Sequence, residues 1–408
     1  MVKFSYEDCL GYAAFLLGFL SLWIPSGYSV GIVGLFSISM LMLFSRGLPS
    51  LSAGQYSTIF VMVSYSFLWM TDGVLRGDGL RDMDQASRFL FAVPVLMAFS
   101  QKRPPLIPLW LGVAFGGIGA FSIAVYQVVF GGVSRASGFI GPEPFGNISA
   151  LLSGLALLGV IWFWVEGERR ALIMFNILGT TAGVGALILS STRASWLAFI
   201  AVFIFILLVI RVFVPDKRVL RFSVFFLVLG LVFSSLSDNA LRDRAIETYK
   251  DLQGYFHGES ELRSVGLRLE VWESSLKIFS QSPLVGSGSE GYDYRMEQLA
   301  SGSTSRGDLL APGHAHNEII DALAKKGAVG GLLVLLVYLV PGVVFFRWYL
   351  ATTDPESRIF AAAGIVIVMN FFIYGMAHAN LENNAGMMNY AFWVAIFLGL
   401  QRESDDAG

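Results

Sequence analysis

Cysteine and charge are both scarce in this chain, and each scarcity excludes a class of protein. Cys9 is the one cysteine among 408 residues, so neither an internal disulfide nor a cysteine-built metal site can form. Charged residues make up 14% of the sequence, against about 25% in an ordinary soluble domain. With 55% hydrophobic residues and a mean hydropathy of +0.64, the chain is too apolar for a soluble protein. A net charge of −2 gives no reason to expect nucleic acid as a partner.

Long apolar runs follow one another along most of the chain. A helix needs about 20 residues to cross a hydrocarbon layer of roughly 30 Å. About twelve runs approach or reach this length, at residues 9–25, 28–45, 56–71, 86–100, 107–130, 147–165, 171–190, 194–214, 219–236, 327–347, 358–376 and 385–401. The first lacks a small-residue cleavage site, which predicts a retained span. The sequence therefore predicts an all-α polytopic membrane protein embedded in the lipid bilayer.

Basic residues are distributed unevenly over the loops between these runs. Loops with an excess of lysine and arginine usually face the cytoplasm. With a cytoplasmic N-terminus, that side holds Lys3, Arg46, Lys102, Arg103, Arg169, Arg170, Arg211, Lys217, Arg218, Arg221, Arg347, Arg358 and Arg402. The short outer loops hold fewer, namely Arg76, Arg81, Arg135 and Arg193, with Arg88 at the edge of a span. We therefore expect both termini to be cytoplasmic.

One long polar segment, near 237–315, interrupts the apolar runs and falls on the outer side. Helices are predicted near 239–253, 266–281 and 316–326, the last ended by Gly327. In the second helix, one side is expected to carry Leu267, Val271, Leu276 and Phe279, and the other the pair Glu273–Lys277. A loop of this length is usually functional or disordered, and its amphipathic pattern favours function.

This order of elements divides the chain into three parts. Residues 1–236 are expected to hold spans one to nine. Residues 237–326 form the outer loop with the candidate site, and residues 327–408 hold the last three spans and a short cytoplasmic tail.

Histidine is also rare, and its placement indicates a candidate site. Two of the four histidines, His314 and His316, lie one residue apart where the outer loop meets an apolar run. An imidazole can exchange a proton near neutral pH, so this boundary suits acid–base chemistry on a lipid-linked substrate. His378 falls in the last outer loop, on the same face. A loop histidine by itself is more often structural, and the spacing reveals no third metal ligand.

Three arginines lie at the outer boundary of the predicted membrane. Arg193 either joins a helix N-terminus to bind an anion or extends to the interface as a structural anchor. Arg268 precedes Trp272 by one turn and is either a ligand-binding residue or a solvated helix arginine. Arg88 follows Asp84 by four residues, so it either serves a site in the membrane or pairs with that carboxylate.

An acid-x-acid triplet, Asp82-Met83-Asp84, also falls on the outer side. Such a pair of carboxylates can hold a divalent metal that bridges a diphosphate. The triplet is common by chance, however, and Asp84 is a good helix cap. The metal-binding interpretation is therefore the weaker one.

These residues together resemble the O-antigen ligases. The residues His316-Asn317, followed by Gly327 and Gly330, resemble the signature of that family. Two further stretches are similar to theirs: Ser191-Thr192-Arg193-Ala194-Ser195-Trp196, and Arg268-x-x-x-Trp272 with Pro283, Gly286 and Gly288 downstream. The resemblance covers most of the chain, including the number of spans and the one large periplasmic loop.

The resemblance implies a glycosyltransferase of the C type in the inner membrane of a Gram-negative bacterium, with its active site facing the periplasm. Such an enzyme moves an O-antigen glycan from undecaprenyl pyrophosphate to the lipid A–core oligosaccharide during lipopolysaccharide synthesis. Arg193 and Arg268 would then bind the pyrophosphate, and His316 would be the essential histidine. Further candidates are Arg88, His314, Asn317, Trp272 and His378. Family members work without a metal, so no metal and no cofactor is expected.

The chemistry of the residues agrees with this implication. Pyrophosphate is a good leaving group when cations take up its developing charge, and two guanidiniums in a site of low dielectric can do so. The acceptor hydroxyl needs a base, which His316 can supply. Direct displacement would invert the anomeric carbon.

Two alternatives remain open at this stage. An O-antigen polymerase or a protein O-oligosaccharyltransferase of the same superfamily would share the donor and differ in the acceptor. A lipid-linked glycan transporter would instead place ionisable residues and broken helices near the membrane midplane. The predicted spans are almost free of charge at their centres, with Pro341 and Asn370 as mild exceptions.

Overall fold

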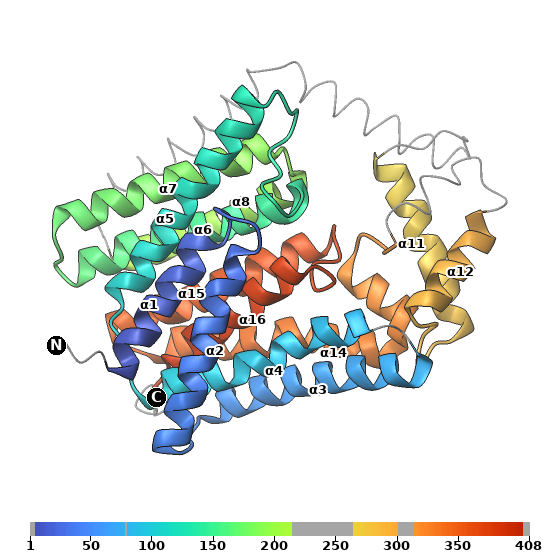
Figure 1. The fold of residues 1–408 in the computed structure, drawn as a ribbon, viewed down its shortest axis with the longest axis horizontal. Helices are drawn as coiled ribbons and strands as arrows, with labels where there is room; N and C mark the ends of the chain where they lie inside the picture. The colour runs from blue at the N-terminus through green and yellow to red at the C-terminus, as the bar shows by residue number, and fades with distance from the viewer. Residues whose placement is uncertain (1–4, 78–79, 214–263, 301–312, 403–408) are drawn as a thin grey trace.

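The described part of the chain is entirely helical (Figure 1). The computed structural model describes residues 5–77, 80–213, 264–300 and 313–402. Its helices are α1 (Tyr6–Leu20), α2 (Gly27–Arg46), α3 (Ala53–Arg76), α4 (Leu80–Gln101), α5 (Ile107–Val125), the π-helix η1 (Tyr126–Phe130), α6 (Pro142–Val165), α7 (Arg170–Ser190), α8 (Arg193–Phe213), α11 (Ser264–Gln281), α12 (Ser289–Ala300), α14 (Glu318–Ala351), α15 (Pro355–Gly375) and α16 (Asn384–Gly399). The predicted all-α polytopic fold is confirmed.

Eight described helices are long and apolar enough to cross a membrane: α2, α3, α5 with η1, α6, α7, α8, α14 and α15. Three other predicted runs also form helices, α1, α4 and α16, but these do not meet the same standard of length and hydropathy. The predicted run at 219–236 lies outside the described residues. By this standard the described residues hold eight spans, fewer than the expected twelve.

Helix α16 illustrates why an apolar run need not contact lipid. It packs against α2, α4, α6 and α15. Every residue from Ala385 to Gly399 is buried by these neighbours. Its 16 residues therefore form part of the protein core.

Three of the basic residues predicted to share one side, Arg46, Lys102 and Arg103, form ion pairs at one end of the described helix bundle. Glu7 forms ion pairs with Arg46 at 2.7 Å and with Lys102 at 3.3 Å, and the two cations come from separate segments of the chain. Arg103 pairs in the same way with Glu356. Helices α1 and α16 place the two described chain ends at this end, away from α11 and α12 (Figure 1).

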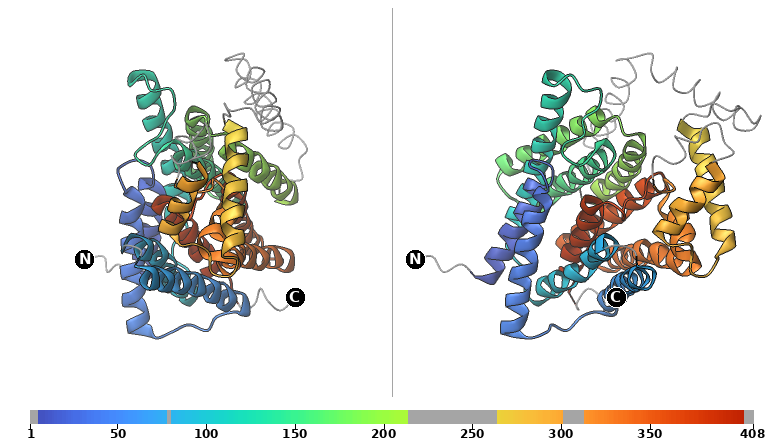
Figure 2. Two further views of the ribbon diagram at one scale, coloured as in Figure 1. Left: turned by 90° about the vertical axis from the view of Figure 1, so that its right-hand side faces the viewer. Right: turned by 45° about the vertical axis from the view of Figure 1, so that its right-hand side comes forward.

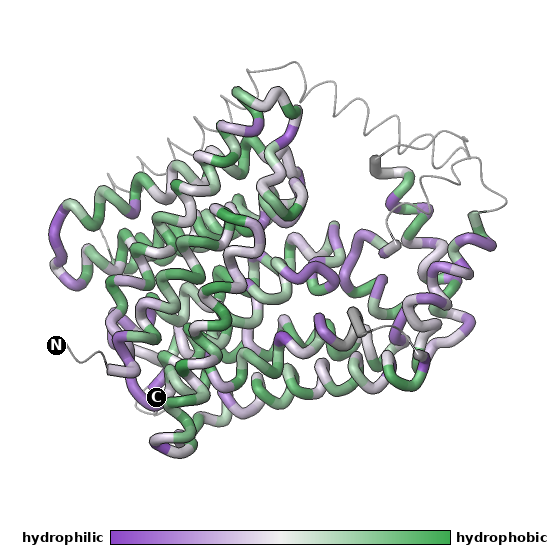
Figure 3. The backbone as a smooth tube through the Cα atoms, in the orientation of Figure 1, coloured by the Kyte–Doolittle hydropathy of each residue, from purple (hydrophilic) through white to green (hydrophobic). Residues whose placement is uncertain are grey.

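Helices α11 and α12 pack side by side at the opposite end, against α14 (Figure 2). Hydrophilic residues concentrate there, whereas hydrophobic residues run along the bundle (Figure 3). The buried face of α11 consists of Val271, Ser274, Ser275 and Ile278. The prediction for this face was wrong at Leu276, which is exposed. The exposed Glu273–Lys277 pair is confirmed, at 2.7 Å.

The sequence analysis did not anticipate helix α12. Its signal was present, since Tyr292, Met296 and Ala300 recur at intervals of four residues and are all buried. The predicted helix near 239–253 lies outside the described residues, as do the side chains of Arg81 and Asp82.

A glycine-dependent junction attaches these outer helices to α14. Gly327 has φ of +67° and interrupts α14, which confirms the predicted end of a first helical segment there. The N–H of Gly288 donates to the carbonyl of Lys325 at 2.8 Å. A Cβ on Gly286 would lie 2.4 Å from the same backbone, closer than real Cβ atoms come. The glycines therefore allow the loop after α11 to lie directly on the break in α14.

Candidate active site

The first turns of α14 position the two loops that carry histidines. Asn317 caps the helix, because its Oδ1 accepts from the N–H groups of Ile319 and Ile320 at 3.1 and 3.2 Å. Its Nδ2 donates to the carbonyl of Met376 at 3.1 Å and so ties the cap to the loop after α15. Asn317, a candidate from the sequence, thus holds the two histidine loops together.

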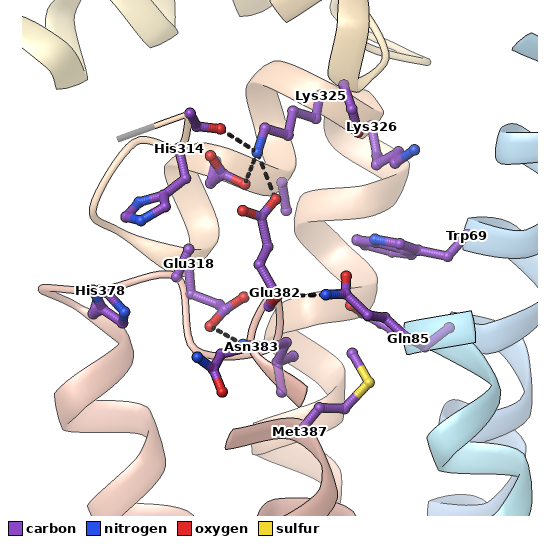
Figure 4. A pocket seen from close by; sticks show the side chains of 17 residues that line it. Trp69, Gln85, His314, Glu318, Lys325, Lys326, His378, Glu382, Asn383 and Met387 are labelled. Carbon is purple, nitrogen blue, oxygen red and sulfur yellow. Dashed lines mark hydrogen bonds and ion pairs between the residues drawn. The ribbon is translucent and has the colours of Figure 1, made fainter. Parts of the chain in front are cut away.

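Charged side chains on one face of α14 reinforce this arrangement. Glu318 accepts from the N–H of Leu381 at 2.9 Å, and Asp321 accepts from the N–H of Ala315 at 2.8 Å. Lys325 lies 3.0 Å from Asp321 and 2.5 Å from Glu382 (Figure 4).

The sequence analysis missed these three residues of α14. Their signal was a helical spacing of three and four positions, Glu318, Asp321 and Lys325, next to a very apolar segment.

Three of the four histidines meet in space. The ring centroids of His314 and His316 are 4.4 Å apart, and those of His314 and His378 are 5.1 Å apart. The backbone of His316 has φ of +50°, which is uncommon for a residue other than glycine. Its N–H donates to Nδ1 of His314 at 3.2 Å. Its own Nδ1 is buried and has no hydrogen-bond partner within the described residues.

All three imidazoles are held neutral. Burial is the largest cause and lowers the pKa of His314, His316 and His378 from 6.5 to about 4 each. The second cause is a neighbouring histidine in every case, and Arg268 lowers the pKa of His316 further. A neutral imidazole has a lone pair available, so this cluster can accept a proton or bind a cation.

The same cluster could hold a metal ion. One ligand nitrogen of each of the three histidines lies within 4.8 Å of the others. His378 is the third ligand that the sequence spacing did not reveal, and three histidines with one open position are a known zinc arrangement. The expectation that no metal is needed remains a prediction.

A cationic cavity of about 410 Å³ adjoins this cluster. Its charged and aromatic lining residues are Arg135, Glu143, Arg193, Arg268, Tyr374 and His378. Arg193 begins α8 and Arg268 lies in the first turns of α11, so two separate segments converge here. The structure therefore brings together the two arginines that the sequence singled out.

The two arginines differ from the other cation of the cavity. Neither Arg193 nor Arg268 makes a hydrogen bond or ion pair with another described residue, and burial together with Arg193 lowers the pKa of Arg268. Arg135 instead pairs with Glu143 at 3.0 Å. Two guanidiniums close enough to repel one another form a site that an anion would stabilise.

Tyr374 was missed by the sequence analysis because it falls inside an apolar run. Its hydroxyl oxygen is buried beside the cationic cavity and has no hydrogen-bond partner among the described residues. Its ring centroid lies 5.3 Å from that of His378. It is therefore a hydroxyl donor available to a bound anion.

A second cavity of about 360 Å³ is lined in part by His314 and His378 (Figure 4). We call it the Trp69 cavity. Its polar and aromatic lining residues are Tyr65, Trp69, Gln85, Ser289, His314, Glu318, Asp321, Lys325, Lys326, His378, Glu382 and Asn383. His378 lines both cavities and so stands between them.

His316 and Asn317 do not line either cavity, and neither do the remaining sequence candidates. Arg88 forms an ion pair with Asp84, in agreement with the structural interpretation of that arginine. Trp272 is half-buried, and its Nε1 has no hydrogen-bond partner among the described residues. Neither Arg88 nor Trp272 lines the cationic cavity or the Trp69 cavity.

Comparison with known proteins agrees with the geometry. Residues 178–335 match the family model described as O-antigen ligase, and this range contains Arg193, Arg268, His314 and His316. This part of the chain is therefore similar to the O-antigen ligase family. Among the curated relatives of this chain, a protein of Escherichia coli (strain K12) named O-antigen ligase is 27% identical over 227 residues. That match covers 54% of this chain and 52% of the relative.

A second relative extends the similarity over most of the chain. An uncharacterized protein of Haemophilus influenzae (strain Rd) is 24% identical over 379 residues, which is 90% of this chain and 92% of that protein. The similarity therefore extends well beyond the matched family domain.

Proposed function

We propose that this protein transfers a glycan from undecaprenyl pyrophosphate to the lipid A–core oligosaccharide, on the periplasmic side of the inner membrane. One observation carries the proposal. Arg193 and Arg268, which are 75 positions apart in the chain, line one cavity beside the cluster that contains His316. A pair of cations next to a neutral base is what glycosyl transfer from a pyrophosphate requires.

The cationic cavity binds the pyrophosphate of the donor in this proposal. Guanidiniums form paired hydrogen bonds with phosphate oxygens, and Arg193 and Arg268 have no competing ion pair among the described residues. The free hydroxyl of Tyr374 can donate to a third oxygen. Because the cavity is partly buried, these groups stabilise the charge that develops on the leaving group more strongly than water does.

His316 acts as the base toward the acceptor hydroxyl. Its low pKa keeps it neutral at pH 7, and the negative charge of a bound donor raises that pKa toward the range of an efficient base. The acceptor oxygen forms a bond to the anomeric carbon as the bond from that carbon to the phosphate oxygen breaks. The hydroxyl proton passes to His316, undecaprenyl pyrophosphate leaves, and the anomeric centre is inverted.

The orientation follows from the charges at the two ends of the bundle. Basic residues of several loops meet around Glu7 and Glu356, at the end opposite the histidine cluster. Basic loops favour the cytoplasmic side. Both termini then lie in the cytoplasm, and the cavities open toward the periplasm.

A transporter is the less favoured alternative. Asn370 is a buried polar residue inside a predicted apolar span. Its Nδ2 donates a hydrogen bond to Oδ1 of Asn147 at 2.8 Å. Asn370 lies midway between the centre of α15 and its end at Gly375, in the half of the helix that leads to Tyr374 and His378. The polar groups therefore support chemistry at one membrane face.

Purified protein tests the proposal directly. It would be incubated with undecaprenyl-pyrophosphate-linked glycan and lipid A–core in the presence of EDTA, beside a His316→Ala variant. A glycan ladder on lipid A–core that EDTA leaves intact and the variant abolishes is the expected result. Longer lipid-linked glycan with unchanged lipid A–core would instead identify a polymerase, and full transfer by the variant would refute the role of His316.

A further inference from the structure

The Trp69 cavity differs from the cationic cavity in its charge. Its cations are already paired with carboxylates: Lys325 with Asp321 and Glu382, and Lys326 with Asp72 at 2.6 Å. Glu318 adds a third carboxylate to the lining. Because both lysines are already paired, the described lining offers a phosphate no unpaired lysine, whereas an uncharged polar molecule needs none. The two cavities therefore suit different parts of the substrates.

An aromatic wall faces the polar groups of this cavity. Trp69 reaches from α3 toward the cavity, opposite the segment that carries Glu382 (Figure 4). Its ring is stacked on Tyr65 with centroids 3.9 Å apart and an angle of 17°, which holds the indole plane in place. Gln85 donates to the backbone carbonyl of Glu382 at 2.7 Å and so holds the segment that faces Trp69 across the cavity.

This combination suits a sugar ring. The flat indole face can cover the C–H face of a pyranose, while amide and carboxylate groups bind its hydroxyls. A volume of about 360 Å³ falls within the range of small-ligand sites. The lining contains the necessary polar groups in Gln85, Glu382 and Asn383.

The geometry of the displacement indicates whether the Trp69 cavity binds a sugar of the donor or of the acceptor. In a direct displacement the nucleophile approaches the anomeric carbon from the side opposite the leaving group. The Trp69 cavity shares His378 with the cationic cavity, so an acceptor bound there would lie next to a pyrophosphate in the cationic cavity. His378 lines both cavities and His314 lines the second, so the histidines lie at the boundary where the two substrates meet.

We infer that the Trp69 cavity is the acceptor subsite, and that it binds the uncharged sugar bearing the accepting hydroxyl between Trp69 and the side chains of Gln85 and Glu382. This inference rests on the proposed transfer reaction. It assigns Trp69 and Gln85 to recognition of the acceptor and leaves recognition of the donor to Arg193 and Arg268.

Steady-state transfer by Trp69→Ala, with each substrate varied in turn at saturating concentrations of the other, tests the inference. Loss of the indole face should raise the KM for the acceptor about tenfold, because aromatic contacts of this size are worth up to about that factor. The KM for the donor should remain unchanged. Trp69→Phe keeps an aromatic face and should recover most of the affinity for the acceptor.

Matched controls separate recognition from folding. Phe67→Ala removes an aromatic side chain of the same helix that is 71% exposed, so it should leave both KM values unchanged. Gln85→Ala tests the cavity from α4 and should also raise the KM for the acceptor alone. Size-exclusion profiles and thermal unfolding midpoints of all variants verify that they fold.

The outcomes test the acceptor subsite and the proposed reaction separately. An active wild type whose Trp69→Ala and Gln85→Ala variants keep their KM for the acceptor would overturn the subsite and leave the proposed function standing. A rise in the KM for the donor would overturn it as well, since the cavity would then bind donor glycan. A wild type that forms no lipid A–core product would refute the proposed function itself.

Discussion

The pH dependence of transfer is a direct consequence of the histidine cluster. Burial lowers the pKa of His316 from 6.5 to about 4, so the base form persists to lower pH than in a solvated imidazole. At pH 5.5 an imidazole with a pKa of about 4 is about 97% neutral, whereas one with a pKa of 6.5 is about 9% neutral. The difference in active base is therefore about tenfold at that pH.

Initial rates measured from pH 4 to 8 give the relevant profile. Because kcat/KM reports ionisations of the free enzyme, it should stay flat from pH 8 to about 5 and fall below that, with a midpoint near 4. The profile of kcat reports the enzyme with substrates bound, and the charge of the donor raises the pKa of His316 there. The acid limb of kcat should consequently lie at higher pH than that of kcat/KM.

An Arg268→Gln variant tests the cause of the shift. Arg268 is one of the groups that lower the pKa of His316, so its removal should move the acid limb of kcat/KM to higher pH. Arg88→Gln removes a guanidinium that lines neither cavity and should leave the limb in place. Samples returned to pH 7 must recover full activity, which excludes acid unfolding. A wild-type limb of kcat/KM near pH 6.5 would refute the reasoning, because His316 would then behave as a solvated imidazole.

The remaining predictions concern the arginines, the glycine junction and metal binding. Arg193→Gln or Arg268→Gln should lower kcat by about 10²–10³, the usual effect of removing one group that stabilises a developing anion. The Arg88→Gln control changes a residue that lines neither cavity and should leave kcat near the wild-type value, and equal losses of activity in all three variants would contradict the assignment. Gly327→Ala places a Cβ 2.3 Å from the backbone of Leu284 at a positive φ, so we expect a loss of about 1–3 kcal/mol and faster proteolysis of the α11–α12 region. Wild-type proteolysis rates in that variant would argue against the junction. Excess Zn²⁺ should inhibit transfer by binding His314, His316 and His378, EDTA should restore it, and His378→Ala should need more Zn²⁺ for half inhibition. Activity that is lost in EDTA and regained with Zn²⁺ would instead indicate a metal-dependent reaction.

The helices could be predicted, and candidate site residues could be singled out, because their signals are local. An apolar run of sufficient length has few stable alternatives to a membrane helix. Arg193, Arg268 and His316 stood out because charged and titratable residues are rare in this chain and occur at the ends of apolar runs. Gly327 was predicted to end a helix, and its positive φ is the reason that it does.

Other features depend on which distant segments come together. His378 is 62 positions from His316 and joins it only because Asn317 and Glu318 bind the loop after α15. Tyr374 belonged to an apolar run, and only the packing of α15 leaves its hydroxyl beside the arginines.

The sequence by itself determined the membrane class, the helices and the residue types available for chemistry, since these depend on composition and helical period. It could not distinguish a lipid-facing helix from a buried one, as α16 demonstrates. The tertiary structure decided which side chains share a cavity and where two cavities meet. Those relations depend on close packing between segments far apart in the chain, where a single contact such as that of Gly286 with α14 sets the position of a whole loop.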